Sequence, residues 1–539
     1  MRGYHAPVEF SPSEAALLSR YFTNLDRPVF ALRNLPEVVK GALFSRYSRT
    51  EKSLRRVLLD EFINDPESGF AGIAASHVFG VGTPADVDDM VAVKRAEEFY
   101  ERVLVGYGDD SVAELAGAHV AMERVSTLAA KALEDSRIGI SPLEKSTRYV
   151  RFDRPGPDGR RLYHRGPELS HPAYEPAADA LFETFSSLLE PLTTAIRERF
   201  PIEPDETDRA WKSATRAKAL DLLRGLLPAG TLTNLGLFGN GRAFEYLITK
   251  MSASELPECR ALATDLHREL AEVIPSFVKR AVDDRYGKPA AERLVRIRTS
   301  LQKVARRTGG EAKPGVRLLS FDADAERKVV QAALYTYSDT PLDSSIQADP
   351  DAVLEALLGG RANRRQRAPR ALERAQYEFE IVANFAAYRD LHRHRMLTQE
   401  RQLLGTSLGY DLPPALADLG MDEAFRRAMD SATAAHQRME ADIGPALAQY
   451  VVPLAYRVRW YFRVNLRELY HLCELRTTPQ GHPDYRFVAQ EMFRLASEVH
   501  PRLTRYATFV DKGAGDELER RKSERRWDEK LRTLGGPVL

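Results

Sequence analysis

Pro228…Asn240-Gly-Arg242…Glu272-Val-Ile-Pro275 and Pro453…Asn465-Leu-Arg467…Glu498-Val-His-Pro501 are two stretches of this 539-residue chain that match each other. The spacing from the first proline to the asparagine is the same in both, and the closing Glu-Val-x-Pro motif is displaced by only one residue. Self-similarity at a fixed spacing indicates repeated structural units. We therefore expect a tandem duplication, with a first copy over residues 1–308, a linker over 309–315, a second copy over 316–510 and a charged helical tail over 511–539.

The overall composition is typical of a soluble globular protein with several domains. Hydrophobic residues make up 43% of the chain and charged residues 29%, and its length suggests about two to four domains. A net charge of +1 gives no support for a nucleic-acid partner. The chain has no apolar run of about 18 residues that could span a membrane. Its two cysteines are too few for a disulfide framework, so we expect a cytoplasmic protein.

Both copies show the same order of local patterns, which predicts a mostly helical α+β domain used twice. Polar and apolar residues alternate over 376–381, as in a half-buried strand, and Asn384 then caps an expected helix. In the first copy, residues 118–125 are a weaker strand candidate, followed by Ser126 as a cap. Longer helices are expected over 178–199, 256–281, 423–448 and 485–506. The alternating acids and bases of the tail predict a solvated helix.

A cluster of basic residues, His392-Arg393-His394-Arg395, stands at the end of the helix expected after Asn384. Cations near a helix C-terminus stabilise the helix dipole, so capping is one interpretation. The other is a set of donors for an electron-rich ring or a phosphate. Histidines two residues apart do not share a helix face, and no third ligand is evident nearby, so we expect no metal site.

The segment Glu144-Lys-Ser146-Thr-Arg148-Tyr149 alternates an acceptor, a hydroxyl and a guanidinium. On an extended segment Glu144, Ser146 and Arg148 would share one face. A hydroxyl with an arginine suits a phosphate, and a carboxylate can accept from a sugar hydroxyl. An ordinary polar strand or turn explains the pattern equally well, and the residues alone leave both interpretations open.

Together these motifs resemble the flavin-dependent thymidylate synthases. The residues that carry the resemblance are Arg393-His-Arg395, Glu144-x-Ser-x-Arg-Tyr149, and Asn465-x-Arg467 followed by Arg476 nine residues later. The family signature is Arg-His-Arg, a short spacer with Ser, and then Ser-x-Arg-Tyr. Members are single-domain chains that form homotetramers, with FAD shared between subunits. The resemblance therefore implies two fused copies and a homodimer that mimics the tetramer.

The resemblance also implies that the two copies keep different parts of the site. The substrate-binding residues implied for the first copy are Glu144, Ser146, Arg148 and Arg224. The cofactor-binding residues implied for the second copy are Arg393, His394, Arg395, Glu373, Asn465, Arg467 and His471, with Arg476 as the catalytic residue that polarises the pyrimidine. The counterparts are replaced by Met251 in the first copy, and by Ser407-Leu-Gly-Tyr410 and Gln449 in the second. Thr398 and Glu400 also depart from the family's Ser and Asn.

The activity that the resemblance implies is reductive methylation of dUMP to dTMP. FAD would be the cofactor, and NADPH and methylenetetrahydrofolate the co-substrates, at a composite site between the copies. In such a site Arg148 and Arg476 would surround one uridylate, in a cleft shared with Arg224 and Arg395. The alternative is a catalytically decayed homologue that acts as a nucleotide- or flavin-binding scaffold.

Overall fold

The computed structural model describes residues 10–35, 37–47, 50–64, 113–148, 150–305, 313–344, 348–515 and 517–533. Two compact units divide the chain: unit 1 comprises Met1–Met122, Ala132–Leu143 and Gly236–Arg306, and unit 2 comprises Glu123–Lys131, Glu144–Leu235 and Arg307–Leu539. The units follow spatial contacts, whereas the expected copies follow sequence similarity, so the copy boundaries stay a prediction. Tyr149 and linker residues 309–312 lie outside the described part of the chain.

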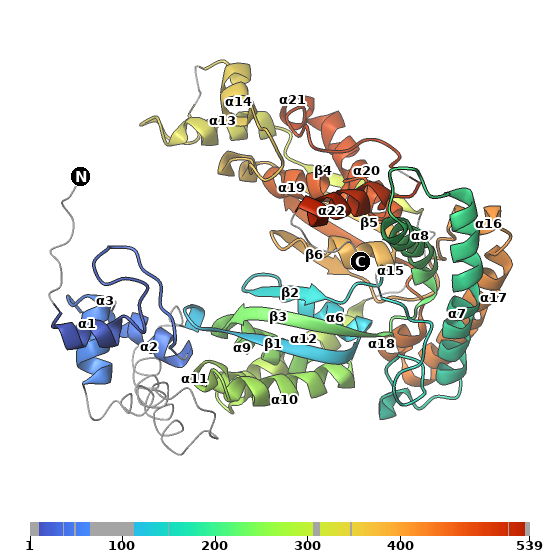
Figure 1. Cartoon of the computed structure of the whole chain (residues 1–539), viewed down its shortest axis with the longest axis horizontal. Helices are drawn as coiled ribbons and strands as arrows, with labels where there is room; N and C mark the ends of the chain where they lie inside the picture. Colours follow the sequence, from blue (N-terminus) through green and yellow to red (C-terminus); the bar gives the residue numbers. More distant parts are fainter. Residues whose placement is uncertain are drawn as a thin grey trace. The chain divides into compact units, whose positions relative to one another are not determined.

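Unit 2 contains a four-stranded antiparallel sheet in the order β4-β5-β7-β6 (Figure 1). The strands are β4 (Gly315–Phe321), β5 (Gln376–Asn384), β7 (Arg457–Asn465) and β6 (Leu397–Arg401). Apolar side chains alternate into the core along β5, as Tyr377, Phe379 and Ile381 are all buried. The strand expected at 376–381 is confirmed, and so is the cap, because Asn384 Oδ1 accepts from the Ala387 amide at 2.8 Å.

A second, three-stranded sheet has the order β1-β3-β2, with β1 (Gly117–Ser126), β3 (Leu232–Asn240) and β2 (Ile140–Glu144). The strand expected at 118–125 is confirmed, and Ser126 Oγ accepts from the Ala129 amide at 2.9 Å in α6 (Thr127–Glu134). The extended segment expected beyond Glu144 is wrong. There the Ser146 hydroxyl accepts from the Arg148 amide at 3.3 Å, a local bond that favours a turn over a strand.

The long helices expected from periodicity are present but interrupted, apart from α7 (Tyr174–Arg199). The interrupted pairs are α10 (Pro257–Ala271) with α11 (Pro275–Val278), α17 (Asp422–Ile443) with α18 (Pro445–Ala448), and α20 (Pro483–Val499) with α21 (Pro501–Thr504). Each second piece begins at a proline, which lacks the amide that a continuous helix needs. Among the described residues, no helix combines the length and apolar character needed to cross a membrane.

The remaining elements complete the two units. Unit 1 has α1 (Pro12–Leu18), α2 (Glu37–Tyr47), α3 (Leu54–Val57), the π-helix η1 (Leu58–Ile63), α9 (Gly241–Ser252), η5 (Lys279–Val282) and α12 (Gly287–Val304). Unit 2 has η3 (Pro167–Leu169), α8 (Asp208–Leu223), η4 (Arg224–Leu226), α13 (Ala325–Tyr335), α14 (Pro350–Leu358), η6 (Arg370–Arg374), α15 (Phe385–Leu391), α16 (Pro414–Asp418), η7 (Gln449–Val451), α19 (Leu466–Arg476) and α22 (Arg521–Thr533).

The matching stretches of sequence form matching elements. The turn η4 leads into β3 and α9, as η7 leads into β7 and α19. Strands β3 and β7 begin and end at equivalent residues, 225 positions apart (232 to 457, 240 to 465). The order of elements and their lengths thus repeat over the stretch that the sequence pattern singled out.

Within unit 2 the two matching turns pair with each other around a bridge between Pro228 and Pro453. The flanking backbone bonds are Ala229 N to Val452 O (2.8 Å), Leu454 N to Leu227 O (2.9 Å), Gly230 N to Tyr450 O (2.8 Å) and Ala455 N to Gly225 O (2.9 Å). When Pro228 is matched to Pro453, each bond has a counterpart with donor and acceptor copies exchanged. Such reciprocity is the property of a contact related by a two-fold axis.

The charged tail forms α22, but it is not solvated on all sides as expected. Asp528 is buried and pairs with Arg209 of α8, and Arg525 pairs with Asp205 at 3.0 Å. Arg521 pairs with Glu206 at 3.1 Å. Alternating charges predict a solvated face only when no complementary charges lie nearby, and α8 with the loop before it supplies them.

The central strand β7 offers a test of the sheet. Phe462 is completely buried and Arg463, the next residue, is exposed on the opposite face. Phe462→Ala should lower the free energy of unfolding by about 3–5 kcal/mol, because it leaves a cavity in the core. Arg463→Ala is the matched control and should change it by less than about 0.5 kcal/mol. Urea denaturation that ranks the two variants in the reverse order would contradict the register of β7.

Candidate functional site

A cavity of about 310 Å³ in unit 2 brings together residues from the end of α15, the start of α19 and the segment before β5. Among its lining residues are Glu373, Arg393, His394, Arg395, Asn465, Arg467, His471 and Arg476. These are all the residues predicted to bind the cofactor, together with the predicted catalytic arginine. Their roles stay predictions, but the structure gathers them around one space.

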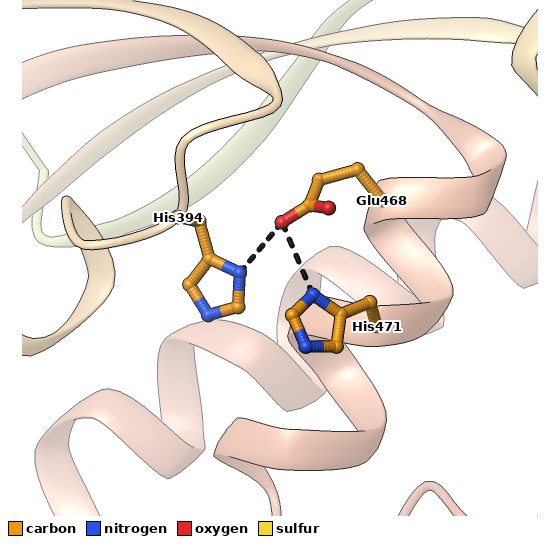
Figure 2. Close-up of side chains that lie close together, drawn as sticks. All are labelled: His394, Glu468 and His471. Atoms are coloured by element: carbon orange, nitrogen blue, oxygen red, sulfur yellow. Dashed lines mark hydrogen bonds and ion pairs between the residues drawn. The ribbon is translucent and has the colours of Figure 1, made fainter. Parts of the chain in front are cut away.

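A hydrogen-bonded chain runs through the buried imidazole of His394 (Figure 2). His394 Nδ1 lies 2.7 Å from Glu468 Oε1, and Arg476 Nε donates to His394 Nε2 at 3.0 Å. Because Nε2 accepts from Arg476, the proton of a neutral ring sits on Nδ1 and is donated to Glu468. Glu468 and His394 therefore fix the Arg476 guanidinium indirectly.

Burial and neighbouring charges hold this chain in one protonation state. Burial first, and then the charge of Arg476, lower the pKa of His394 to about 4 despite the opposing effect of Glu468. Burial would raise the pKa of Glu468, but the hydrogen bonds from His394 and His471 lower it to about 2. Near neutral pH the chain is thus a carboxylate, a neutral imidazole and a guanidinium.

Within the described residues His394, Glu468 and His471 form a set whose ligand atoms all lie within 4.8 Å, so they could hold a metal ion. The expectation that no third ligand lies near His394 is therefore wrong, because Glu468 and His471 come from α19, far along the sequence. His394 nevertheless spends both ring nitrogens on Glu468 and Arg476. The adjacent guanidinium repels a divalent cation, so hydrogen bonding explains this arrangement better than metal binding.

Two of the predicted flavin contacts also have local structural roles. Asn465 caps α19, since its Oδ1 accepts from the Glu468 amide at 2.9 Å. Arg467 Nη1 donates to Glu373 at 2.6 Å, and its Nε donates to the Ala368 carbonyl at 2.8 Å. Both residues therefore hold the N-terminus of α19 against the segment before β5.

Glu144, predicted to meet a sugar hydroxyl, is fully buried and surrounded by cations. Its Oε2 accepts from Lys131 and Arg393, and its Oε1 from Arg389, each at 2.9 Å. Both oxygens are engaged by the chain itself. A carboxylate buried among three cations ties the end of β2 to α15 and to the basic cluster after it.

Arg148, predicted to hold a phosphate, forms a bidentate pair with Asp221. Its Nε and Nη2 donate to the Asp221 carboxylate at 2.6–2.9 Å, and Nη1 donates to the Gln480 carbonyl at 3.2 Å. Burial alone would lower the pKa of Arg148, but Asp221 raises it, with smaller effects from Tyr485 and Asp390. Ser146 lies beside it in the turn and bonds to the Arg148 amide, as described above.

Arg224 lines a second cavity of about 320 Å³ in the same unit, together with Asp221, His482 and Asp484. The arginine is only 3% exposed. Its Nη1 donates to Asp390 at 3.4 Å, while Nε and Nη2 have no hydrogen-bond partner among the described residues. Buried donors are normally satisfied, so these two groups point to an acceptor that a ligand would supply.

Asp390 lies between the two groups of arginines. Burial would raise its pKa, but Arg224, Arg393 and Arg476 hold the pKa of this carboxyl well below its usual range. Asp390 also acts on the pKa of Arg148. The one cleft expected to hold Arg148, Arg224, Arg395 and Arg476 is therefore two cavities, with Asp390 close to arginines of both.

Three important carboxylates escaped the sequence interpretation. Glu468 stands three residues after Asn465, the spacing of a capping box, which could have revealed it. Asp221 and Arg224 are three residues apart on one helix face, a weaker signal. No sequence pattern distinguishes Asp390, whose importance comes only from arginines distant in the chain.

Comparisons with known proteins agree with these features. The family model described as thymidylate synthase complementing protein (Thy1) matches residues 70–276 and again 317–502. A UPF0159 protein of Chlamydia muridarum is 44% identical over 96% of this chain and 98% of its own length. A flavin-dependent thymidylate synthase of Sulfolobus acidocaldarius is 26% identical over 36% of this chain and 76% of its own.

One solved structure matches a part of the chain, but too weakly to carry an argument about the fold. It is a UMP/dUMP methylase of Streptomyces cacaoi, 19% identical, with a TM-score of 0.31 over 38% of this chain and 98% of that one. The family assignment therefore rests on the two matched segments, which cover most of the chain. This protein belongs to the thymidylate synthase complementing protein family, the family of the flavin-dependent thymidylate synthases.

Proposed function

We propose that this protein is an FAD-dependent thymidylate synthase-like enzyme that methylates dUMP reductively to dTMP, with methylenetetrahydrofolate and NADPH as co-substrates. Its site would be composite, built from two tandem copies of the family domain. The first copy would contribute Arg224 and Arg148 to the nucleotide. The second copy would contribute the arginine-lined cavity to the flavin and Arg476 to the pyrimidine. Family membership supports the reaction class, and one residue, Arg224, carries the proposal for the nucleotide.

Arg224 combines three properties of a phosphate ligand. It is buried, it lines a cavity, and two of its N–H groups lack acceptors in the described structure. Leaving a buried charged donor unsatisfied is costly, so a phosphate that accepts both bonds would bind favourably. Gln449 occupies the equivalent position in the second copy, and its Oε1 accepts from Arg401 and the Leu404 amide. This difference supports a nucleotide site on one side only.

The other proposed nucleotide ligands need a refined role. Arg148 can reach a phosphate only by exchanging Asp221 for it, so Arg224 would make the first contact. For Glu144 we propose a positioning role, since Arg389 and Arg393 already bind its oxygens. Ser146 would hold the turn that carries Arg148.

The residues of the arginine-lined cavity suit a flavin dinucleotide. Guanidinium groups such as those of Arg395 and Arg467 match the geometry of a diphosphate. When bound, FAD would supply the hydride and the acceptor for the one-carbon unit. Arg476 would stabilise negative charge on the pyrimidine, and its orientation toward His394 is fixed before any ligand arrives. Glu373, Asn465 and His471 would complete the cofactor contacts.

A scaffold that binds nucleotide or flavin without catalysis is the second candidate. The observation that favours it is the bidentate Arg148–Asp221 pair, in which the chain's own carboxylate occupies an arginine assigned to substrate. The two candidates differ in turnover, not in binding, and one set of variants addresses both.

Wild-type protein supplied with FAD, NADPH and methylenetetrahydrofolate should convert dUMP to dTMP. Arg224→Ala should weaken dUMP binding roughly 10- to 150-fold, the loss of one to two charge-assisted contacts, with flavin content unchanged. Arg395→Ala should do the reverse. Isothermal titration with dUMP and the flavin absorbance of the purified variants measure the two effects.

Arg216→Ala is the matched control, because Arg216 is exposed on the same helix α8 and should leave both ligands unaffected. Equal loss of dUMP and flavin from folded Arg224→Ala and Arg395→Ala would contradict the division between copies. Tight binding of both ligands without any dTMP would identify the scaffold.

The stability of unit 2 should fall as the pH falls below about 6.5, because of His482. Burial first, and then Arg224, lower the pKa of this buried histidine from 6.5 to about 3. Between these values the unfolded chain binds a proton that the folded chain does not, so protonation favours unfolding. His482→Gln should therefore give a smaller decrease in unfolding free energy between pH 6.5 and 4. Equal pH slopes for variant and wild type, measured by denaturant titration, would refute this.

We propose that two chains pair as a homodimer that reproduces the four-domain assembly of the family. The reciprocal contact at Pro228 and Pro453 already joins two elements that separate subunits would otherwise provide. Light scattering at micromolar concentration should give twice the 60.6 kDa mass of one chain. A stable monomer with bound flavin would contradict the proposal.

A further inference from the structure

A basic segment, residues 361–367, borders the arginine-lined cavity and belongs to none of the motifs above. It lies between α14 and η6 and contains four arginines, Arg361, Arg364, Arg365 and Arg367. Arg361, Arg364 and Arg367 line the cavity, whereas Arg365 does not. The spacing of three places alternate arginines toward the same space.

Arg361 anchors this segment to α19. Its Nη1 and Nη2 donate to the two carboxylate oxygens of Glu474 at 2.7 Å, and its side chain is only 9% exposed. Its Nε donates to the Gln366 carbonyl at 2.8 Å, which closes the turn on itself. A buried bidentate pair of this kind fixes the path of the backbone. The turn therefore presents its other arginines from a defined position.

Arg364 and Arg367 are exposed, and neither forms a hydrogen bond or ion pair with any residue that the structure describes. Counting charged side chains, seven arginines and three glutamates line the cavity, a surplus of four positive charges. The glutamates are already engaged within the chain: Glu373 by Arg467, Glu468 by His394 and Glu474 by Arg361. The surplus charge is thus available to a ligand and repels cations.

We propose that Arg364 and Arg367 form an anion subsite that binds a phosphoryl group of a dinucleotide held in this cavity. The inference rests on the proposed function for the identity of the dinucleotide and adds two ligands to those that the family resemblance implies. Guanidinium forks bind phosphoryl oxygens through paired, charge-assisted hydrogen bonds. The diphosphate of FAD and the 2′-phosphate of NADPH share this chemistry.

The test compares the full-length R364A/R367A double variant with wild type, and R365A is the matched control from the same turn. The probes are FAD, riboflavin, NADPH, NADH and inorganic pyrophosphate, measured by fluorescence and calorimetry at one salt concentration. The double variant should bind a phosphate-bearing probe about tenfold or more weakly. Its affinity for riboflavin, which has no phosphate, should stay within about twofold, and R365A should resemble wild type for every probe.

The pattern of losses identifies the source of the phosphoryl group. Weaker FAD with unchanged riboflavin assigns the subsite to the diphosphate, and weaker NADPH with unchanged NADH assigns it to the 2′-phosphate. If wild type binds neither flavin nor NADPH, but binds pyrophosphate in a way that the double variant loses, the subsite stands and the proposed enzyme fails. Unchanged affinities in the double variant, equal losses in R365A, or a wild type that binds no phosphate-bearing probe would each overturn the subsite.

Discussion

The backbone pairing around Pro228 and Pro453 is the constraint on which the rest of unit 2 depends. Neither proline has an amide hydrogen, so the bridge is held by the amides beside them, and each bond has its reciprocal in the other copy. The turns that carry Arg224 and Gln449 stand directly before the pairing strands. Equivalent positions of the two copies therefore meet inside one chain, and a residue lost from one copy faces its retained counterpart in the other.

This arrangement gives a physical reason why the two copies could diverge without losing the site. Glu144 comes from the first copy, yet its carboxylate is bound by Arg389 and Arg393 of the second. A buried carboxylate among three cations tolerates no single substitution, because each partner left alone would be an uncompensated charge. Positions outside such links, such as Met251 and Gly409, were free to drift.

Local patterns predicted local features, and distant contacts decided the rest. The strand at 376–381 and the cap at Asn384 followed from alternation and capping chemistry, and the structure has both. The long helices were overextended because periodicity continues across Pro275 and Pro501, where the chain breaks. The cavity residues were predicted from motif resemblance. Their carboxylate partners Asp221 and Asp390 were not, because an ion pair between residues far apart in sequence leaves no periodic trace.

Those carboxylates set what the site can bind. Arg148 and Arg224 each face a carboxylate of the chain, so an incoming anion must compete with Asp221 or Asp390. A carboxylate carries one negative charge, whereas a phosphate monoester near neutral pH carries close to two and offers three acceptor oxygens. Exchange therefore favours a nucleoside monophosphate over a monoanion, and a neutral nucleoside gains nothing from it. Internal pairing in this way keeps buried arginines satisfied in part, while leaving the two unpartnered donors of Arg224 to select for a dianion.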